Sequence, residues 1–257
     1  MKIYIVRHAD PDYEHDTLTE HGWEEARRLV PRFSTLDIKN FYVSPLGRAR
    51  DTASCTLQAL HRTAEVCDWL REFPAELNVS DYEELKAAYP DTKYAADGTS
   101  KRIVWDMLPG YLTAHPEYLD RCLWRKSLVA ANSDIVSVYD SVTTQFDMLL
   151  AKHGYERQGD CYHAVHPNRD AIAFFCHYGL ECVLLSHLMN VSPFALWNGT
   201  VFAPTSVSLL RTEERKSGIA YFRAAQLGDI SHLYVDGMEP SFSARFCETY
   251  DDWTERH

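Results

Sequence analysis

Two short apolar runs, each followed directly by basic side chains, constrain the fold of this chain more than any other feature. Residues 2–6 (KIYIV) lead into Arg7 and His8, and residues 171–176 (AIAFFC) lead into His177. A run that is apolar almost throughout, rather than alternating with polar residues, is typical of a strand covered on both faces of a parallel sheet. We therefore predict two buried strands, each ending at a histidine.

Helical patterns alternate with strand patterns along the chain. This alternation predicts an α/β fold with a mainly parallel sheet and helices on both of its faces. The other expected elements are a helix at 19–30 capped by Thr19 and ending near Pro31, a strand at 41–43, a helix at 45–61 capped by Ser44, a strand at 66–70, helices at 133–154 and 180–188, and a hairpin at 207–221 with its turn at 211–218.

The length of the chain predicts one domain over residues 1–257, because single α/β domains commonly reach about 250 residues. Residues 77–130 interrupt the pattern, since aromatic residues are scattered there among prolines without any repeat. We interpret this stretch as an insertion of short helices and loops. Its aromatic side chains either line a substrate pocket or form a small core of the insertion's own.

Composition excludes several classes of partner. The chain carries 26 Lys and Arg against 37 Asp and Glu, a net charge of −11, so we expect no nucleic-acid or membrane partner. The N-terminal apolar run stops at Arg7 and is too short for a signal peptide, which predicts a cytoplasmic protein. The seven cysteines include no CxxC pair and are expected to be reduced. No ligand spacing typical of a metal site occurs, and we expect no metal and no cofactor.

The predicted strands bring their polar ends to one edge of the sheet, where ligands of such folds bind. Arg7 and His8 follow the first strand, Arg48 follows the second, Glu72 follows the third and His177 follows the late apolar strand. Guanidinium forks suit a tetrahedral phosphate, and the start of a helix at Arg48 would add backbone donors. A neutral imidazole is a competent nucleophile toward phosphorus, and a carboxyl group can act as acid and then base.

Several short motifs resemble the histidine phosphatase superfamily, also called the phosphoglycerate mutase-like family. Arg-His-Ala at 7–9 resembles its Arg-His-Gly signature, and residues 18–29 resemble the helix that follows. Residues 44–53 (SPLGRARDTA) resemble its SPLxRAxQTA motif, residues 174–179 (FFCHYG) its second-histidine motif, and residues 226–233 (QLGDISHL) its C-terminal segment. The matches occur in the family's order, and together they identify the chain as a member.

The resemblance implies a role for each matched position. It implies that His8 becomes phosphorylated, that Arg7, Arg48 and His177 hold the phosphoryl oxygens, and that Glu72 is the proton donor. The family usually continues from this glutamate into Gly-x-Trp-Glu-Gly, whereas Phe-Pro-Ala-Glu follows here. Glu76 or an acid of the insertion is therefore an alternative donor.

Two further departures from the family pattern concern the phosphate pocket. Ala9 replaces the usual glycine and is expected to narrow the approach slightly. Glu14 stands where many members carry an asparagine, and it would repel phosphate if it pointed inward.

The function expected from these motifs is hydrolysis of a small phosphorylated metabolite by a histidine acid-type phosphatase, a phosphoric monoester hydrolase, through a phosphohistidine. One alternative is a phosphoglycerate-type mutase, although the Arg-His-Tyr-Gly continuation that resembles true mutases is absent near Glu72. The other alternative is a non-catalytic phosphate-binding or interaction module on the same fold.

Overall fold

The structure is a computed structural model that describes residues 1–89, 92 and 95–241, without the side chain of Asp81. The chain forms two compact units. The first consists of Met1–Glu72, His153–Glu181 and Val201–His257, and the second of Phe73–Lys152 and Cys182–Thr200. The predicted insertion at 77–130 falls within the second unit, while the expectation of a single domain stays a prediction.

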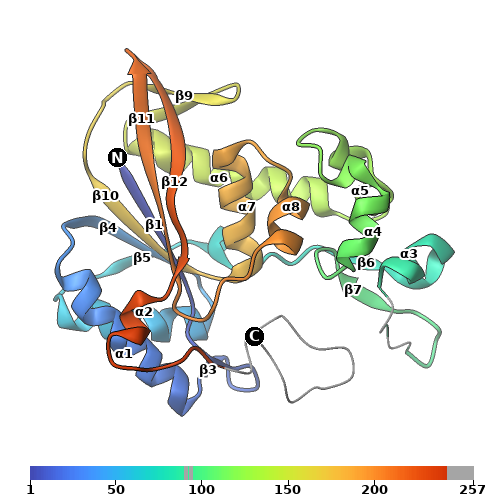
Figure 1. The fold of residues 1–257 in the computed structure, drawn as a ribbon, viewed down its shortest axis with the longest axis horizontal. Helices are drawn as coiled ribbons and strands as arrows, with labels where there is room; N and C mark the ends of the chain where they lie inside the picture. The colour runs from blue at the N-terminus through green and yellow to red at the C-terminus, as the bar shows by residue number, and fades with distance from the viewer. Residues whose placement is uncertain (90–91, 93–94, 242–257) are drawn as a thin grey trace. The chain divides into compact units, whose positions relative to one another are not determined.

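An eight-stranded sheet forms the centre of the first unit (Figure 1). Its strands, in spatial order, are β5 (Ala64–Val66), β4 (Ile38–Val43), β10 (Ala171–Cys176), β1 (Lys2–Arg7), β11 (Val207–Lys216), β12 (Ile219–Asp229), β9 (Cys161–Ala164) and β8 (Tyr155–Gln158). The first four run parallel to one another, and the others extend the sheet by antiparallel pairing. The predicted α/β class is confirmed, and all the predicted site residues follow the parallel strands.

The two apolar runs form adjacent parallel strands, as predicted. All six residues of β10 and five of the six in β1 are buried. In the register of the pair, Arg7 lies opposite Cys176. The backbone N–H of His8 continues the ladder by donating to the Cys176 carbonyl at 2.9 Å. His8 and His177 therefore leave the sheet at the same level.

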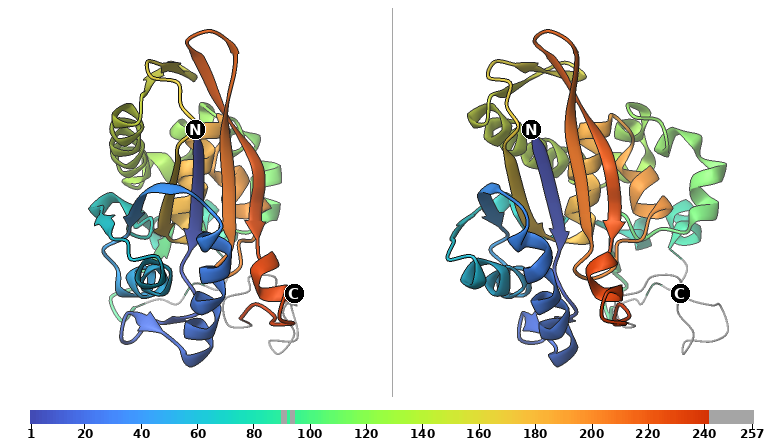
Figure 2. Two further views of the ribbon diagram at one scale, coloured as in Figure 1. Left: turned by 90° about the vertical axis from the view of Figure 1, so that its left-hand side faces the viewer. Right: turned by 60° about the vertical axis from the view of Figure 1, so that its left-hand side comes forward.

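Two helices, α1 (Glu20–Ser34) and α2 (Gly47–Ala59), cover one face of the parallel strands (Figures 1 and 2). Thr19 caps α1 through a hydrogen bond from the Gly22 N–H, as expected. Pro31 lies near the end of the helix, as expected, since α1 ends at Ser34. Phe33 in this last turn is fully buried in the core of this face.

Three predicted boundaries are wrong. Ser44 does not cap α2, whose N-cap is Leu46. The third strand is Ala64–Val66 rather than 66–70, and Asp68–Leu70 forms a short 3-10 helix, η1. The strand β11 continues through residues 211–216 to a turn at Gly218, where φ is +77°. This positive φ suits glycine, so the chain reverses there. The resulting hairpin of β11 and β12 extends beyond β1, and its end pairs with β9 (Figure 2).

The first unit also contains β2 (Pro11–Asp12), β3 (Thr17–Leu18) and α9 (Ser231–Tyr234). Helix α7 (Tyr178–Met189) begins in it and continues in the second unit. The second unit contains η2 (Val79–Asp81), η3 (Pro116–Tyr118), η4 (Leu123–Lys126), β6 (Glu76–Asn78), β7 (Lys101–Ile103), α3 (Glu83–Ala88), α4 (Pro109–Ala114), α5 (Leu128–Ala131), α6 (Ile135–Lys152) and α8 (Pro193–Gly199). Helix α6 matches the helix expected at 133–154, and α7 the one expected at 180–188.

Aromatic side chains form the core of the second unit. Tyr118 and Trp124 are buried and pack against Phe194, with ring centroids 5.0 and 6.1 Å away, and Tyr89 is buried as well. The aromatic residues at 77–130 were expected either to line a pocket or to form a core of the insertion. For Tyr89, Tyr118 and Trp124, burial supports the core. Tyr94 lies outside the described residues.

The six cysteines in the described part of the chain are free thiols, as expected, and Cys247 lies outside it. Across the described residues, no helix combines the length and the apolar character needed to cross a membrane.

Candidate active site

Two imidazoles face each other where β1 and β10 end. The ring centroids of His8 and His177 are 5.1 Å apart, with an angle of 57° between the ring planes. Both side chains are buried. The two histidines, 169 positions apart in the chain (177 − 8), thus lie side by side, as the sheet topology predicts.

The hydrogen bonding of His8 leaves one ring nitrogen available. Its Nδ1 lies 2.7 Å from the carbonyl oxygen of Ala9, which can only accept, so Nδ1 carries the proton. The Nε2 lone pair is then free. Burial lowers the pKa of His8 well below its usual value, and the charges of Arg7 and Arg48 lower it further, although the Ala9 bond opposes them. A neutral imidazole with a defined tautomer is the form that acts as a nucleophile.

His177 is held by Ser44. The Ser44 hydroxyl lies 2.7 Å from Nε2 of His177, and both groups are buried. Burial lowers the pKa of His177 well below its usual value, and His8, Arg48 and Arg7 lower it further. The ring is therefore neutral at pH 7. Ser44 thus orients the second histidine instead of capping α2.

Arg7 is a buried cation beside these rings. Its guanidinium donates to the Phe202 carbonyl, and its Cζ lies 5.7 Å from the centre of the Tyr178 ring. Burial lowers the pKa of Arg7, while the negative charge of Glu72 is among the effects that raise it. A guanidinium stays charged even so, and it supplies a fixed positive charge next to the histidines.

Arg48 stands in the first turn of α2 and is paired with Asp16. The Arg48 guanidinium donates to one oxygen of the Asp16 carboxylate at 2.8 Å, and the Gly47 N–H donates to the other at 2.6 Å. A side chain on Gly47 would place its Cβ 1.9 Å from the Asp16 carbonyl oxygen, so only glycine fits there. The backbone donor expected at this helix end, the Gly47 N–H, therefore donates to Asp16.

The side chain of Glu72, which follows η1 in the chain, lies beside the first turn of α7. One oxygen of its carboxylate accepts the Leu180 N–H at 3.1 Å, and its charge acts on Arg7. The structure thus brings Glu72 to the same end of the sheet as Arg7. The alternative donor Glu76 belongs to the second unit, where it is exposed on β6 and pairs with Ile103 in the sheet register.

The segment after His8 is fastened to both helices. The Ala9 N–H donates to the Thr52 hydroxyl of α2 at 2.9 Å, and the Asp10 N–H donates to the Glu25 carboxylate of α1 at 2.8 Å. Glu25 also accepts the Ser241 N–H at 3.0 Å, and burial raises its pKa to about 6. These bonds fix the backbone that carries His8.

Ala9 and Glu14, the two departures from the family pattern, lie in different environments. The Ala9 side chain packs in an apolar cluster with Leu18 and Ala26, which corrects the expectation that its methyl group narrows the phosphate approach. Glu14 is exposed in the loop between β2 and β3. Its neighbour Tyr13 is 70% exposed, and the Arg48 guanidinium lies 5.4 Å from the centre of the Tyr13 ring.

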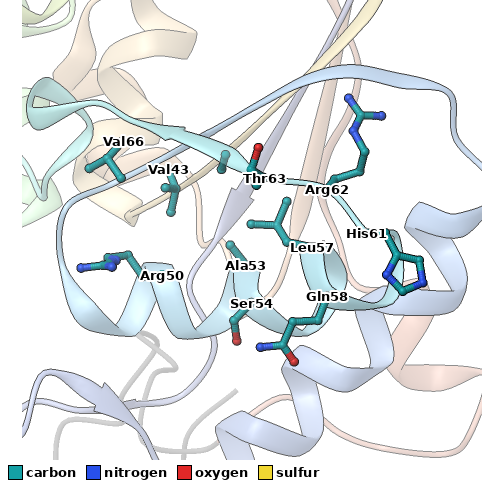
Figure 3. Close-up of a pocket in the computed structure, with 11 residues that line it drawn as sticks. Val43, Arg50, Ala53, Ser54, Leu57, Gln58, His61, Arg62, Thr63 and Val66 are labelled. Atoms are coloured by element: carbon teal, nitrogen blue, oxygen red, sulfur yellow. The ribbon is translucent and has the colours of Figure 1, made fainter.

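A separate hollow of about 550 Å³ lies beside α2 in the first unit (Figure 3). It has an apolar floor that includes Leu57, and three basic residues line it: Arg50, His61 and Arg62. Arg50 and His61 stand at opposite ends of the helix, and Arg62 donates to the carbonyls of Ile38 and Lys39. The basic groups do not converge, so the hollow has no built anion site.

No group of three or more His, Cys, Asp or Glu side chains within the described ranges is arranged to hold a metal ion. The predicted site residues at the strand ends supply two guanidiniums, two imidazoles and the carboxyl group of Glu72. Guanidiniums can bind phosphoryl oxygens, and a neutral imidazole can act as a nucleophile toward phosphorus.

Comparison with known proteins shows what these residues are similar to. Residues 3–106 match the sequence model of the histidine phosphatase superfamily (branch 1). Over this part of the chain, the sequence is therefore similar to that superfamily. A 2,3-bisphosphoglycerate-dependent phosphoglycerate mutase from Thermoplasma acidophilum is 34% identical over 73 residues, which cover 24% of this chain and 36% of the mutase. The match thus spans little more than a third of that relative.

Solved structures of two phosphatases share the fold over most of the chain. A phosphoserine phosphatase variant from Entamoeba histolytica, in complex with phosphoserine, has a TM-score of 0.55 at 13% identity. The comparison covers 90% of this chain and 98% of that one. A mycobacterial glucosyl-3-phosphoglycerate phosphatase with inorganic phosphate has a TM-score of 0.56 at 16% identity, with the same coverage. Identities this low establish the fold alone.

Four residues at this site were missed by sequence reasoning: Tyr13, Asp16, Ser44 as a partner of His177, and Glu181. Ser44 lies inside a matched motif, so the motif itself was a signal for it. Glu181 is an isolated charge within the apolar run LECVLL, which is also a readable signal. Asp16 and Tyr13 stand in a polar loop, where nothing in the sequence distinguishes them from their neighbours.

Proposed function

We propose that the chain is a phosphomonoester hydrolase that works through a covalent phosphohistidine on His8, as a histidine acid-type phosphatase. The observation that carries the proposal is the neutral His8, with Nδ1 bonded to a carbonyl and Nε2 free, beside His177, Arg7 and Arg48. The match of residues 3–106 to the superfamily's sequence model and the fold shared with a phosphatase support it.

In the first step, the Nε2 lone pair of His8 attacks phosphorus and the bond from phosphorus to the ester oxygen breaks. Arg7, Arg48 and His177 hold the non-bridging oxygens, where negative charge gathers in the transition state. The departing oxygen takes a proton from a carboxylic acid, the role assigned to Glu72. The products are the free alcohol and phosphorylated His8.

In the second step, the same carboxylate removes a proton from water as the water oxygen attacks phosphorus. The bond between phosphorus and Nε2 breaks, inorganic phosphate leaves, and His8 returns to its neutral form. Atoms and charges balance without any cofactor. We propose a small phosphorylated metabolite as the substrate, since phosphoserine and glucosyl-3-phosphoglycerate appear in the names of structural relatives.

The test of the nucleophile is His8→Ala, with His163→Ala as the matched control because His163 is an exposed histidine on β9. The variants are assayed with an aryl phosphate and a panel of metabolite monoesters. The phosphoenzyme is detected as a phosphoryl label on the protein that is released by acid. We expect His8→Ala to abolish turnover and labelling, and His163→Ala to keep both. Equal rates in the two variants would refute the mechanism.

The proton donor is tested by comparing Glu72→Gln with Glu76→Gln. Loss of a general acid slows esters with poor leaving groups far more than esters whose leaving groups need no proton. We expect Glu72→Gln to lose activity by about 10²–10⁴-fold on an alkyl phosphate and much less on dinitrophenyl phosphate. The same pattern in Glu76→Gln, with Glu72→Gln unaffected, would move the role to Glu76.

A phosphoglycerate-type mutase is a second candidate, because the curated relative with 34% identity is such a mutase. A mutase passes the phosphoryl group of His8 to a second alcohol instead of water. Incubating the labelled phosphoenzyme with monophosphoglycerates distinguishes the two functions. Transfer of label to the sugar acid favours the mutase, and release as inorganic phosphate favours the hydrolase. Tight phosphate binding without labelling or turnover would favour a non-catalytic module.

A further inference from the structure

One fully buried carboxyl group has no part in the steps above. Glu181 lies on α7 one turn after His177, and its backbone N–H donates to the His177 carbonyl at 2.9 Å. Its side chain is 0% exposed. Neither carboxyl oxygen makes a hydrogen bond of normal geometry within the described residues, although the Ser208 hydroxyl is near enough to act on the group. An unsatisfied carboxylate at such a position is costly, so the group calls for an explanation.

The groups that face Glu181 come from four elements. Arg7 lies at the end of β1, Glu72 follows η1 and Ser208 belongs to β11. The fourth element is α7 itself, where the Glu181 N–H donates to the carbonyl of His177, the residue before the helix. Burial is the largest influence and raises the pKa of Glu181 to about 8. The charge of Glu72 raises it too, whereas Ser208 and Arg7 lower it. The carboxyl group is therefore protonated at pH 7.

The protonation state of Glu181 determines how strongly the positive charge of Arg7 attracts a bound phosphoryl group. A neutral carboxyl group beside Arg7 leaves that charge whole. A buried carboxylate would offset the positive charge of Arg7 and would also repel a phosphoryl dianion. Both effects are strong because they act in a region of low dielectric. Arg7 already has an acceptor in the Phe202 carbonyl, so it does not need Glu181 as a counterion to stay in place.

We propose that Glu181 is a positioning residue that, in its protonated form, lies within electrostatic range of Arg7 without neutralising it, and that ionisation of Glu181 weakens phosphoryl binding at alkaline pH. The identity of the bound group rests on the proposed phosphohydrolase function. The dependence on one buried proton is a property of this chain's own Glu181.

The test is Glu181→Gln, which has nearly the same shape and cannot ionise. We expect the variant to match the wild type in kcat/KM for an aryl phosphate at pH 6. At pH 9 only about a tenth of the wild type would carry the proton on Glu181, so the variant should exceed it about tenfold. Effects of other titrating groups cancel in this ratio. Glu24→Gln, which removes an exposed carboxylate of α1, is the matched control and should give a ratio of one at both pH values.

Binding of inorganic phosphate provides a readout that needs no turnover. Calorimetric affinities of the wild type and Glu181→Gln should agree at pH 6 and differ about tenfold at pH 9, with the variant tighter. If the wild type hydrolyses no monoester but these affinities diverge as expected, the proposed function is wrong and the role of Glu181 stands. Affinity and activity ratios that do not change with pH would overturn it. So would a loss at pH 6, which would mean that the carboxylate is the working form, or a wild type that binds no phosphate.

Discussion

The titration of Glu181 by itself should change the free energy of unfolding by several kcal/mol as the pH rises. This prediction does not involve catalysis. The pKa of this carboxyl group rises from 4.5 to about 8 in the folded chain. A carboxyl group whose pKa is raised on folding stabilises the fold fully below its unfolded value, and that contribution is lost as the pH rises through the folded value. The wild type should therefore lose stability steadily between about pH 4.5 and pH 8.

The size of the effect follows from the shift. Each pKa unit corresponds to about 1.4 kcal/mol, and about two and a half units of the difference are titrated between pH 5 and pH 8. Glu181→Gln has no such titration. Its free energy of unfolding, relative to the wild type, should rise by roughly 3–4 kcal/mol over this interval. At about 2–4 °C per kcal/mol, the difference between the two melting temperatures should change by roughly 7–14 °C.

Urea unfolding and scanning calorimetry of both proteins at pH 5 and pH 8 measure this difference directly. A constant offset between the two proteins, such as the cost of burying an amide, cancels when the two pH values are compared. An unchanged difference would refute the reasoning, because it would mean that Glu181 titrates as an ordinary exposed glutamate. The inference about Arg7 would then lose its basis.

Three further predictions concern the core and the rim of the site. Phe33→Ala should lower the free energy of unfolding by about 3–5 kcal/mol in urea titrations, because Phe33 is fully buried among Tyr4, Phe41 and Phe175; a cost below 1 kcal/mol would contradict this packing. Ser44→Ala should weaken inorganic phosphate binding by about 1–3 kcal/mol in calorimetry, because it frees the ring of His177, and an unchanged affinity would contradict that role. Tyr13→Ala should raise KM for aryl phosphates and leave kcat unchanged, since its exposed ring stands beside Arg48. Tyr13→Phe should keep the wild-type KM, and a fall in kcat alone would contradict the contact.

The strands and the meeting of the two histidines could be predicted from sequence, because they depend on local patterns. An apolar run of six residues at 171–176 is readable as a buried strand, and the topology of parallel strands then brings His177 to the same edge as His8. The position of Glu72 was readable for the same reason, although the element before it is a 3-10 helix rather than a strand.

Features that depend on contacts between distant segments could not be predicted. The pairing of Asp16 with Arg48 requires a loop to fold back onto the start of α2, and no local pattern encodes that return. The role of Ser44 as the partner of His177, rather than as the cap of α2, likewise depends on a contact between segments that are distant in the sequence. The protonation of Glu181 depends on burial, which is a property of the whole fold.

The register that places Arg7 opposite Cys176 limits how this protein can change its chain length. Side chains on a strand alternate between two sides, so inserting or deleting one residue inside β1 would send the imidazole of His8 to the wrong side. The same holds for β10 and its histidine. Gains and losses of sequence in homologous proteins should therefore be confined to the connections between strands, and the spacing from the first residue of each of these two strands to its histidine should be invariant.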